Sequence, residues 1–273
     1  MNDHDKEELE LDIFLKIVEE CYQYDFKDYA RASIKRRVQN LMHESHCDHI
    51  SDLLPKILYE PEFINAFLTS MSVTVTEMFR DPWVFKIIRE QVVPALKIFP
   101  KINIWHAGCA TGEEVYSMAI ILKEEGLLEH TQIYATDFNN NSLDYAKEGI
   151  YPLENLQLFT KNYRTSGGKN SFMDYFHVKY NSAKINNDLK KNIVFTNHNL
   201  VTDKVFGEMN LIVCRNVLIY FKQVLQNRVL GLFNKSLKAR GFLVLGDKET
   251  TQFSTKSDCF EMFSAKEKIF RRI

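Results

Sequence analysis

Several polar side chains of this sequence stand directly after apolar, β-prone runs, where they could bind a ligand. Asp137 ends the run that begins at Thr131, and Arg215 and Asn216 follow the run that begins at Leu211. An acid at the end of the second strand of an α/β domain commonly accepts hydrogen bonds from the two hydroxyls of a ribose. These residue types therefore indicate a ligand that contains a nucleoside.

The element that must position them runs from Ile102 to Glu114 and predicts a strand, a glycine turn and a helix. The segment Ile102–Ala107 is apolar, Gly108 and Gly112 delimit the turn, and helical spacing of apolar residues follows. This is the first unit of a doubly wound α/β domain, in which ligands bind at the carboxyl ends of the strands. No Lys followed by Ser or Thr comes after the second glycine, so the turn is not a P-loop. The spacing allows a nucleoside cofactor without a pyrophosphate, which fits S-adenosylmethionine.

Simpler interpretations of the same residues stay open at this point. Glu113 and Glu114 would suit the first turn of a helix in any protein, because acids favour the positive end of the helix dipole. Asp137 could be a helix N-cap or a turn residue, roles that Asn139 and Asn141 could fill equally well.

Four motifs, in this order and spacing, resemble the chemotaxis receptor methyltransferases called CheR. They are Thr74–Pro82, Ala107–Ser117, Ala135–Asn139 with Leu143, and Cys214–Phe221. Members of that family methylate glutamate side chains of chemoreceptors with S-adenosylmethionine. The chain departs from the family pattern at Val115, where proline is usual, and at Asp247, where the family often has histidine.

The resemblance implies a fold and a division into domains. We expect an α/β fold, a Rossmann-like class I S-adenosylmethionine-dependent methyltransferase domain with a small β subdomain insertion, preceded by a small all-α N-terminal domain. The expected ranges are 1–72 for the helical domain, 73–85 for a linker that lines the cofactor site, and 86–273 for the methyltransferase domain, with the β subdomain at about 160–190. In some family members this subdomain grips a tethering peptide of the receptor by strand addition.

The resemblance also implies site residues, which we carry over by position. Arg80 and Tyr220 are the expected catalytic residues. Arg80 could pair with the methionine carboxylate, since a guanidinium matches a carboxylate geometrically. The residues expected to bind the cofactor are Thr74, Thr76, Arg80, Glu114, Asp137, Asn199, Leu200, Arg215 and Asn216. Arg215 could instead hold the incoming glutamate or support its own loop, Arg80 could be a domain-interface ion pair, and Tyr220 could be a core tyrosine.

Methyl transfer from a sulfonium to a carboxylate needs no general base and no metal. The sulfonium is already a strong electrophile, so the task of the protein is to position the reactants and exclude water. We therefore expect S-adenosylmethionine as the cofactor, S-adenosylhomocysteine and a glutamate methyl ester as the products, and no metal. His43, His46, Cys47 and His49 form a dense group, but no second cluster completes a metal site.

Bulk properties narrow the function further. The 273 residues include 45% hydrophobic and 26% charged ones, with a net charge of -1, so the chain should fold without a general attraction to nucleic acid. The acidic start is unlike a signal peptide, no apolar run is long enough for a membrane span, and five scattered cysteines suit a reducing compartment. We expect a cytoplasmic monomer.

One basic cluster stands out in the N-terminal helices. It consists of Lys27, Arg31, Lys35 and Arg36, with Arg37 beside them. It is either a solvated face or, as the resemblance favours, the surface that docks an acidic chemoreceptor helix. Two other functions remain open: a methyltransferase with a small-molecule or RNA acceptor, and a module that senses S-adenosylmethionine without turnover.

Overall fold

The structure is a computed structural model that describes residues 2–71 and 76–273. Its contacts divide the chain into two compact units. One consists of Met1–Val73 with Tyr220–Gln226, and the other of Thr74–Ile219 with Asn227–Ile273. We call them the helical unit and the α/β unit and describe each by itself. No helix within the described residues combines the length and apolar composition that crossing a membrane requires.

The helical unit is built on amphipathic helices that bury one face each. These are α1 (Asp3–Tyr22), α2 (Arg31–Glu44), α3 (Leu53–Tyr59) and α4 (Phe63–Met71). The predicted apolar face of α2 is buried at Ile34, Val38 and Leu41, and Phe14 of α1 packs edge-on against Phe67 of α4. The hydrophobic faces therefore meet in one core.

Two helix boundaries differ from expectation. Apolar spacing predicts a helix over Tyr29–Ser45, but α2 begins at Arg31, because Tyr29 forms a β-bridge with Phe221. The two prolines predict interruptions near Pro55 and Pro61 in the helical stretch Ser51–Phe67. The first is wrong, since Pro55 lies in the first turn of α3, where a missing N–H breaks no helical hydrogen bond. The break predicted near Pro61 is confirmed between α3 and α4.

The α/β unit is organised around a seven-stranded sheet with the order β6-β2-β1-β7-β8-β10-β9. Its strands are β1 (Ile102–Ala107), β2 (Thr131–Asp137), β6 (Ile193–Asn197), β7 (Met209–Cys214), β8 (Leu237–Leu245), β9 (Phe260–Ser264) and β10 (Ile269–Arg272). The first five in spatial order are parallel, and β10 runs antiparallel to β8 and β9. The apolar runs at Phe260–Phe263 and Lys268–Arg271 predict a closing antiparallel hairpin, and the pairing of β9 with β10 confirms it.

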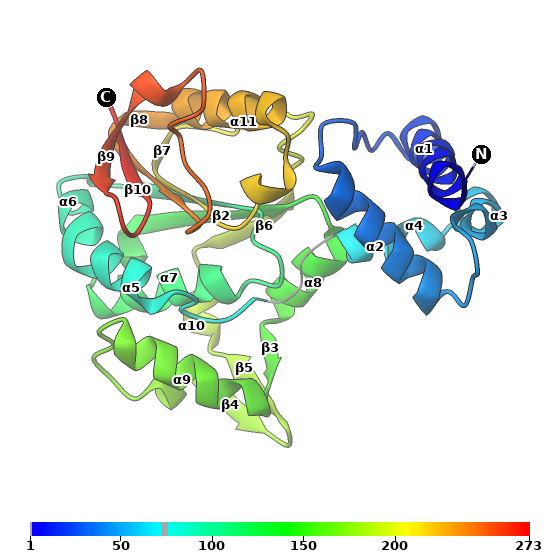
Figure 1. Cartoon of the computed structure of the whole chain (residues 1–273). Coiled ribbons are helices and arrows are strands. Elements are labelled where there is room, and N and C mark those ends of the chain that lie inside the picture. The colour runs from blue at the N-terminus through cyan, green and yellow to red at the C-terminus, as the bar shows by residue number, and fades with distance from the viewer. Residues whose placement is uncertain (1, 72–75) are drawn as a thin grey trace. The chain divides into compact units, whose positions relative to one another are not determined.

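Helices cover both faces of this sheet (Figure 1). The helices of the unit are α5 (Pro82–Ile87), α6 (Val93–Leu96), α7 (Glu113–Glu124), α8 (Asn140–Glu148), α9 (Leu156–Thr165), α10 (Asn187–Lys190) and α11 (Gln223–Ser236), with a π-helical turn at Ile88–Val92. Figure 1 shows α11 on one face and α5 to α7 on the other. Because both faces are covered, β1 and β7 are almost entirely buried.

The strand after α11 begins earlier than we predicted. The apolar spacing after Phe221 predicts a helix over Lys222–Lys238 and a strand from Phe242, but α11 ends at Ser236 and β8 begins at Leu237. The pairing of β8 with β7 is irregular here, because it passes from Leu237 opposite Met209 to Phe242 opposite Leu211, and Arg240 has φ of 61°. An added Cβ at Gly241 would lie 2.9 Å from the carbonyl oxygen of Lys238 and 3.1 Å from that of Asn210, so the glycine allows close packing in this irregular stretch of β8.

A second, three-stranded antiparallel sheet has the order β3-β5-β4. It consists of β3 (Ile150–Pro152), β4 (Phe176–Lys179) and β5 (Ser182–Ile185). Its first strand precedes residue 160, where we expected the small subdomain to begin, and α9 stands between β3 and β4. Tyr151 and Phe159 of this insertion pack into the core of the α/β unit.

Candidate functional site

The turn between β1 and α7 is built so that only glycine fits at its two ends. Gly108 and Gly112 have φ of 80° and 92°. An added Cβ would lie 2.6 Å from Cγ2 of Val217 at the first position and 2.9 Å from Cβ of Ala146 at the second. The backbone of the turn is therefore held close to two neighbouring elements at the carboxyl end of the sheet.

Asp137 closes this turn from the adjacent strand. Its Oδ2 accepts the N–H of Ala110 at 2.9 Å and its Oδ1 accepts the N–H of Asn139 at 3.0 Å. Burial raises the pKa of Asp137, while these two hydrogen bonds oppose the rise. A carboxylate has about four lone-pair sites, so the same oxygens can accept two further hydroxyl groups. The N-cap of α8 is Asn139, whose side chain accepts from Asn141 and Ser142, so Asp137 is not that cap. The bond from the N–H of Asn139 to Asp137 Oδ1 agrees with the other simple alternative, a turn residue.

Glu114 is held by donors from two other elements. Nδ1 of His106, on β1, lies 3.0 Å from its Oε1, and Nη1 of Arg215 lies 3.1 Å from its Oε2. Desolvation opposes ionisation here, but the His106 hydrogen bond and the Arg215 charge outweigh it and hold the pKa of Glu114 below its ordinary value. Glu114 is therefore an oriented anion at the start of α7.

Arg215 is committed to contacts within the protein. Besides Glu114, its guanidinium reaches Oδ2 of Asp81 at 2.5 Å and donates to the carbonyl oxygen of Arg80 at 3.2 Å. Its side chain is 2% exposed. Of the two roles left open for Arg215, these contacts favour the support of its surroundings over the capture of an incoming carboxylate.

The segment around Arg80 has an unusual backbone. Phe79 and Asp81, on either side of it, both have φ of 55°, in the left-handed region that costs energy for residues with a side chain. Ser117 Oγ accepts the N–H of Phe79 at 2.8 Å, and Arg215 holds the next two residues. Thr76 is partly buried, and Thr74 lies outside the described residues.

Asn199 and Leu200 come to the same edge of the sheet as Asp137. They follow β6, which pairs with β2, and the N–H of His198 donates to the carbonyl oxygen of Asp137. The Asn199 side chain accepts the N–H of Val201 at 2.9 Å, and Leu200 is buried. The amide group of Asn199 thus shapes its own turn beside Asp137.

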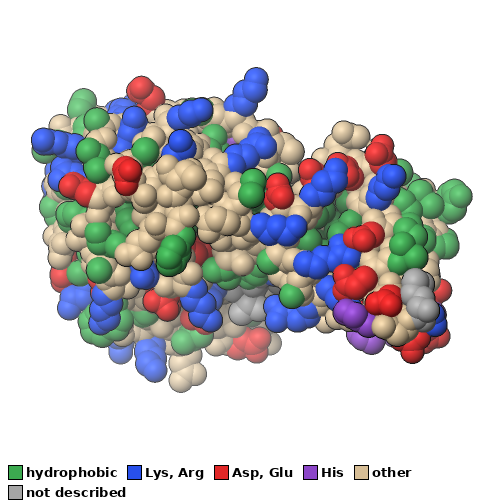
Figure 2. Space-filling view, turned by 45° about the horizontal axis from the view of Figure 1, so that its top comes forward, with side chains coloured by type: hydrophobic (Ala, Val, Ile, Leu, Met, Phe, Trp, Pro, Cys, Tyr) green, Lys and Arg blue, Asp and Glu red, His purple; other side chains and the backbone are tan. Residues whose placement is uncertain are grey.

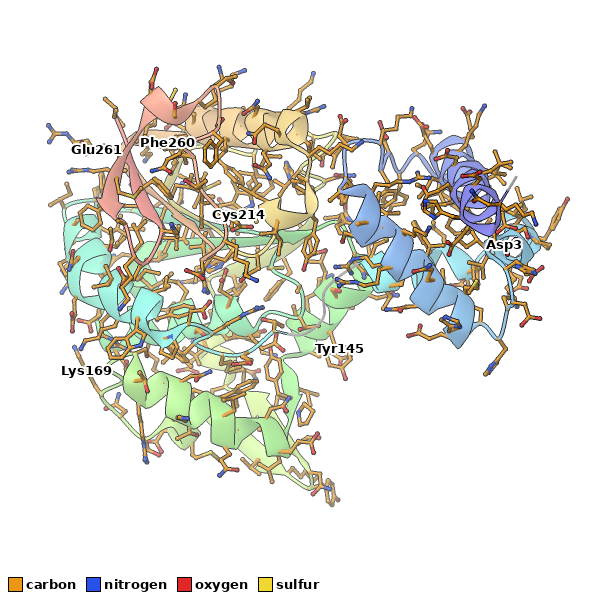
Figure 3. The ribbon with its side chains drawn as sticks, viewed as in Figure 1. Asp3, Tyr145, Lys169, Cys214, Phe260 and Glu261 are labelled. Atoms are coloured by element: carbon orange, nitrogen blue, oxygen red, sulfur yellow. The ribbon has the colours of Figure 1, made fainter. Side chains whose placement is uncertain are left out.

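Asn216 follows the end of β7 directly after Arg215. Figure 3 labels Cys214, the last residue of that strand. Asn216 has φ of 59°, and its backbone N–H donates to Glu249.

Tyr220 and the basic cluster belong to the helical unit. The guanidinium carbon of Arg37 lies 4.8 Å from the centroid of the Tyr220 ring. Lys27, Arg31 and Lys35 make ion pairs with Glu19, Glu8 and Glu7 at 2.5, 2.9 and 2.7 Å. Figure 2 accordingly shows acidic and basic side chains interspersed on this unit. Arg36 is exposed.

Two residues of the site escaped the sequence analysis. His106 is a polar residue between apolar neighbours near the end of β1, which is the signal that could have found it. Glu249 follows β8 by four residues and is buried, whereas Asp247, the departure that drew attention, is exposed. Val115, the other departure, is buried in the first turn of α7. Within residues 2–71 and 76–273, no three His, Cys, Asp or Glu side chains are grouped to hold a metal ion.

The sheet order and this edge define a class I S-adenosylmethionine-dependent methyltransferase. The residues fit that cofactor: a glycine turn, Asp137 with unused lone pairs, and an oriented Glu114 anion lie at the strand ends where a nucleoside and an amino group would bind. Comparison with known proteins agrees. Residues 74–269 match the family described as "CheR methyltransferase, SAM binding domain", and residues 9–72 match "CheR methyltransferase, all-alpha domain". The chain belongs to the CheR methyltransferase family.

Individual relatives span nearly the whole chain. The protein named Cher3 of Pseudomonas putida is 47% identical, and the match covers 97% of each chain. "Chemotaxis protein methyltransferase 1" of Vibrio cholerae is 30% identical over 87% of this chain and 86% of its own. Among solved structures, the N-methyltransferase NodS from Bradyrhizobium japonicum, in complex with S-adenosyl-L-homocysteine, is 13% identical with a TM-score of 0.41 over 86% of this chain and 98% of its own.

Proposed function

We propose that the protein transfers the methyl group of S-adenosylmethionine to glutamate carboxylates of chemoreceptors, giving glutamate methyl esters and S-adenosylhomocysteine. The observation that carries this proposal is the match to both CheR domains over residues 9–72 and 74–269. Relatives that match 87% to 88% of this chain are named chemotaxis protein methyltransferases. Such an enzyme would work in the cytoplasm, as a monomer, on the cytoplasmic helices of receptors.

S-adenosylmethionine supplies an electrophilic methyl group when it is bound. The residues of the chain then hold and orient the reactants, since a carboxylate attacks without a general base. In this proposal Asp137 accepts the ribose hydroxyls, Glu114 takes the amino group, and Arg80 pairs with the methionine carboxylate. Asn199 and Leu200 contact the adenine, Thr74 and Thr76 line the site, and Tyr220 orients the attacking carboxylate.

The contacts of Arg215 support a positioning role within this scheme. Its guanidinium holds Glu114 from one side and the Arg80–Asp81 backbone and side chain from the other. Arg215 would thereby keep the residues for the two charged ends of the methionine moiety at a fixed separation. Asn216, next in the chain, would face the cofactor from the end of β7.

We further propose that α2 docks the receptor through the basic cluster. The ion pairs of Lys27, Arg31 and Lys35 reduce the positive charge of this face, while Arg36 is exposed. Acidic receptor side chains would then meet Arg36 directly and compete with Glu7, Glu8 and Glu19 for the others. Such docking would weaken as the salt concentration rises.

The experiment that tests the function uses methyl-labelled S-adenosylmethionine and membranes that contain chemoreceptors from the same cell. We expect base-labile volatile methanol only when receptors are present, and its loss in Arg80→Ala and a large decrease in Tyr220→Phe. Cofactor binding by calorimetry without any label transfer to receptors would contradict the proposed acceptor. That result would favour another acceptor or a sensing module.

A further inference from the structure

Glu249 connects the carboxyl ends of two neighbouring strands through one buried carboxylate. Its Oε2 accepts the N–H of Gly246, just beyond β8, at 2.5 Å, and the N–H of Asn216, just beyond β7, at 3.1 Å. Its Oε1 accepts the N–H of Ile219 at 3.3 Å. The residue as a whole is 4% exposed. Three backbone donors from two different loops therefore converge on this side chain.

Burying a carboxyl group at this place costs free energy if it is ionised and lacks hydrogen bonds. Burial raises the pKa of Glu249, and the backbone hydrogen bonds from Gly246, Asn216 and Ile219 oppose that rise. A buried carboxylate is tolerated only when hydrogen bonds replace its lost hydration, and bonds to an ionised acceptor are stronger than neutral ones. Two of the three donors, the N–H groups of Asn216 and Ile219, belong to the loop that carries Arg215.

The loop that these bonds hold has a conformation that needs support. Asn216 is in the left-handed region with φ of 59°, a conformation that asparagine tolerates better than most residues. An added Cβ at Gly246 would lie 2.8 Å from the backbone nitrogen of Asn216, so the two strand ends are in backbone contact. Glu249 fixes this contact because one of its oxygens accepts the backbone N–H groups of both Gly246 and Asn216.

Arg215 and Asn216 are thus held by two supports, one acting on a side chain and one on the main chain. The guanidinium of Arg215 is held by Glu114 and Asp81, and the backbone of Asn216 is held by Glu249. Neither support alone determines where both residues point, because one acts on a side chain and the other on the main chain.

We propose that Glu249 is a positioning residue for S-adenosylmethionine binding. It acts through the Arg215–Ile219 segment and does not touch the cofactor. The inference rests on the proposed function, which places Arg215 and Asn216 at the cofactor site.

The test compares Glu249→Gln and Glu249→Ala with the control Asp247→Ala, an acid removed from the exposed part of the same turn. S-adenosylmethionine affinity is measured by calorimetry, folding by circular dichroism, and exchange of the Asn216 and Ile219 amides by hydrogen exchange. We expect Glu249→Ala to weaken binding on the order of 10-fold or more, as for lost hydrogen-bond partners behind metal ligands. Glu249→Gln should be intermediate, since its amide oxygen still accepts two N–H groups while its NH₂ faces the third. Asp247→Ala should bind S-adenosylmethionine with the affinity of the wild-type protein.

The outcomes separate this inference from the proposed site. Faster exchange at Asn216 and Ile219 together with weaker binding supports the positioning role. Unchanged affinity in a folded Glu249→Gln and Glu249→Ala, with only a lower melting temperature, would show that Glu249 merely stabilises the fold. Asn216→Ala is the second arm: if it too leaves affinity unchanged, the placement of this segment at the cofactor site fails. Should Glu249→Ala not fold, the isosteric Glu249→Gln decides the question alone.

Discussion

Nδ1 of His106 lies 3.0 Å from Oε1 of Glu114, so a histidine from inside the sheet supports the carboxylate that opens α7. His106 is fully buried, and its Nε2 has no hydrogen-bond partner among the described residues. Within the described residues, the His106 ring therefore forms its hydrogen bond to Glu114 through Nδ1 and none through Nε2. With Arg215 on the other oxygen, Glu114 cannot rotate without losing a donor.

His106→Leu should weaken S-adenosylmethionine binding. It removes the hydrogen bond to Oε1, so Glu114 is less well oriented toward the amino group in the proposed site. A hydrogen bond to a charged group contributes about 1.5 kcal/mol or more, which corresponds to roughly tenfold in affinity. His106→Asn is the matched control, because its amide NH₂ can replace the Nδ1 donor. Calorimetry should rank the affinities, from strongest to weakest, as wild type, His106→Asn and His106→Leu. Equal affinities in all three would remove His106 from the support of the site.

Glu113 predicts a pH dependence of stability. Burial raises its pKa from 4.5 to about 7, so its ionisation in the folded state is disfavoured. A raised carboxyl pKa makes the fold lose stability as pH rises from about 4.5 to about 7, after which the loss is constant. Glu113→Gln keeps an acceptor for the Thr111 hydroxyl, 2.7 Å from Glu113 Oε2, but carries no charge.

The free energy of unfolding of Glu113→Gln should therefore increase relative to that of the wild-type protein as pH rises. Between pH ~5.5 and ~8.5 the difference in the free energy of unfolding should shift by about 2 kcal/mol in favour of Glu113→Gln. Urea unfolding at the two pH values measures it. Glu129→Gln, the same change at an exposed position, is the control and should show no such shift. A gain that is the same at both pH values would mean that Glu113 is not the group responsible.

How much of this architecture could be predicted depends on whether the signal is local. The β1–turn–α7 unit was predictable, because a β-prone run, two glycines and helical periodicity lie within about twenty residues. Asp137 was found as a strand-end acid, and its contact with Ala110 follows from parallel neighbours. The start of β8 at Leu237 was missed because Gly241 is typical of a helix end, whereas here it lies in an irregular stretch of β8, close to the backbone of Lys238 and Asn210.

The residues that the sequence did not reveal are those defined by partners far along the chain. Glu249 acquires its role from Asn216, 33 positions away, and Arg215 from Asp81, 134 positions away. Pro55 was misplaced because proline is compatible with a first helical turn, and only the preceding turn at Ile50–Asp52 shows that α3 starts there. At Glu249 and Arg215 tertiary contacts thus decide between local alternatives, whereas at Pro55 the adjoining turn decides.

Tyr151→Phe should lower the affinity for S-adenosylmethionine, because it removes a hydrogen bond from the small sheet to the glycine turn. The hydroxyl of Tyr151, on β3, donates to the carbonyl oxygen of Thr111 in the glycine turn at 2.9 Å, and the residue is 2% exposed. Its removal leaves a buried acceptor with one partner fewer, which costs about 1 kcal/mol in stability and should lower S-adenosylmethionine affinity by several-fold at most. Denaturant unfolding and calorimetry measure both effects.

Tyr180→Phe is the control for this prediction. It makes the same chemical change in the turn between β4 and β5, where the tyrosine is 85% exposed, so neither stability nor affinity should change. If Tyr151→Phe behaves like Tyr180→Phe, the small sheet does not support the glycine turn through this hydrogen bond.

Arg36→Glu should reduce receptor methylation without changing the affinity for S-adenosylmethionine. Arg36 is exposed on α2, and the charge reversal would repel the acidic receptor helix that we propose to dock there. The reduction should appear in kcat/KM for receptor membranes, be largest at low salt, and shrink as added salt screens the charges. Lys16→Glu makes the same reversal at an exposed position of α1 and should leave methylation nearly unchanged. Equal losses in both variants would indicate a general effect of net charge, and no loss in Arg36→Glu at low salt would move the docking surface away from α2.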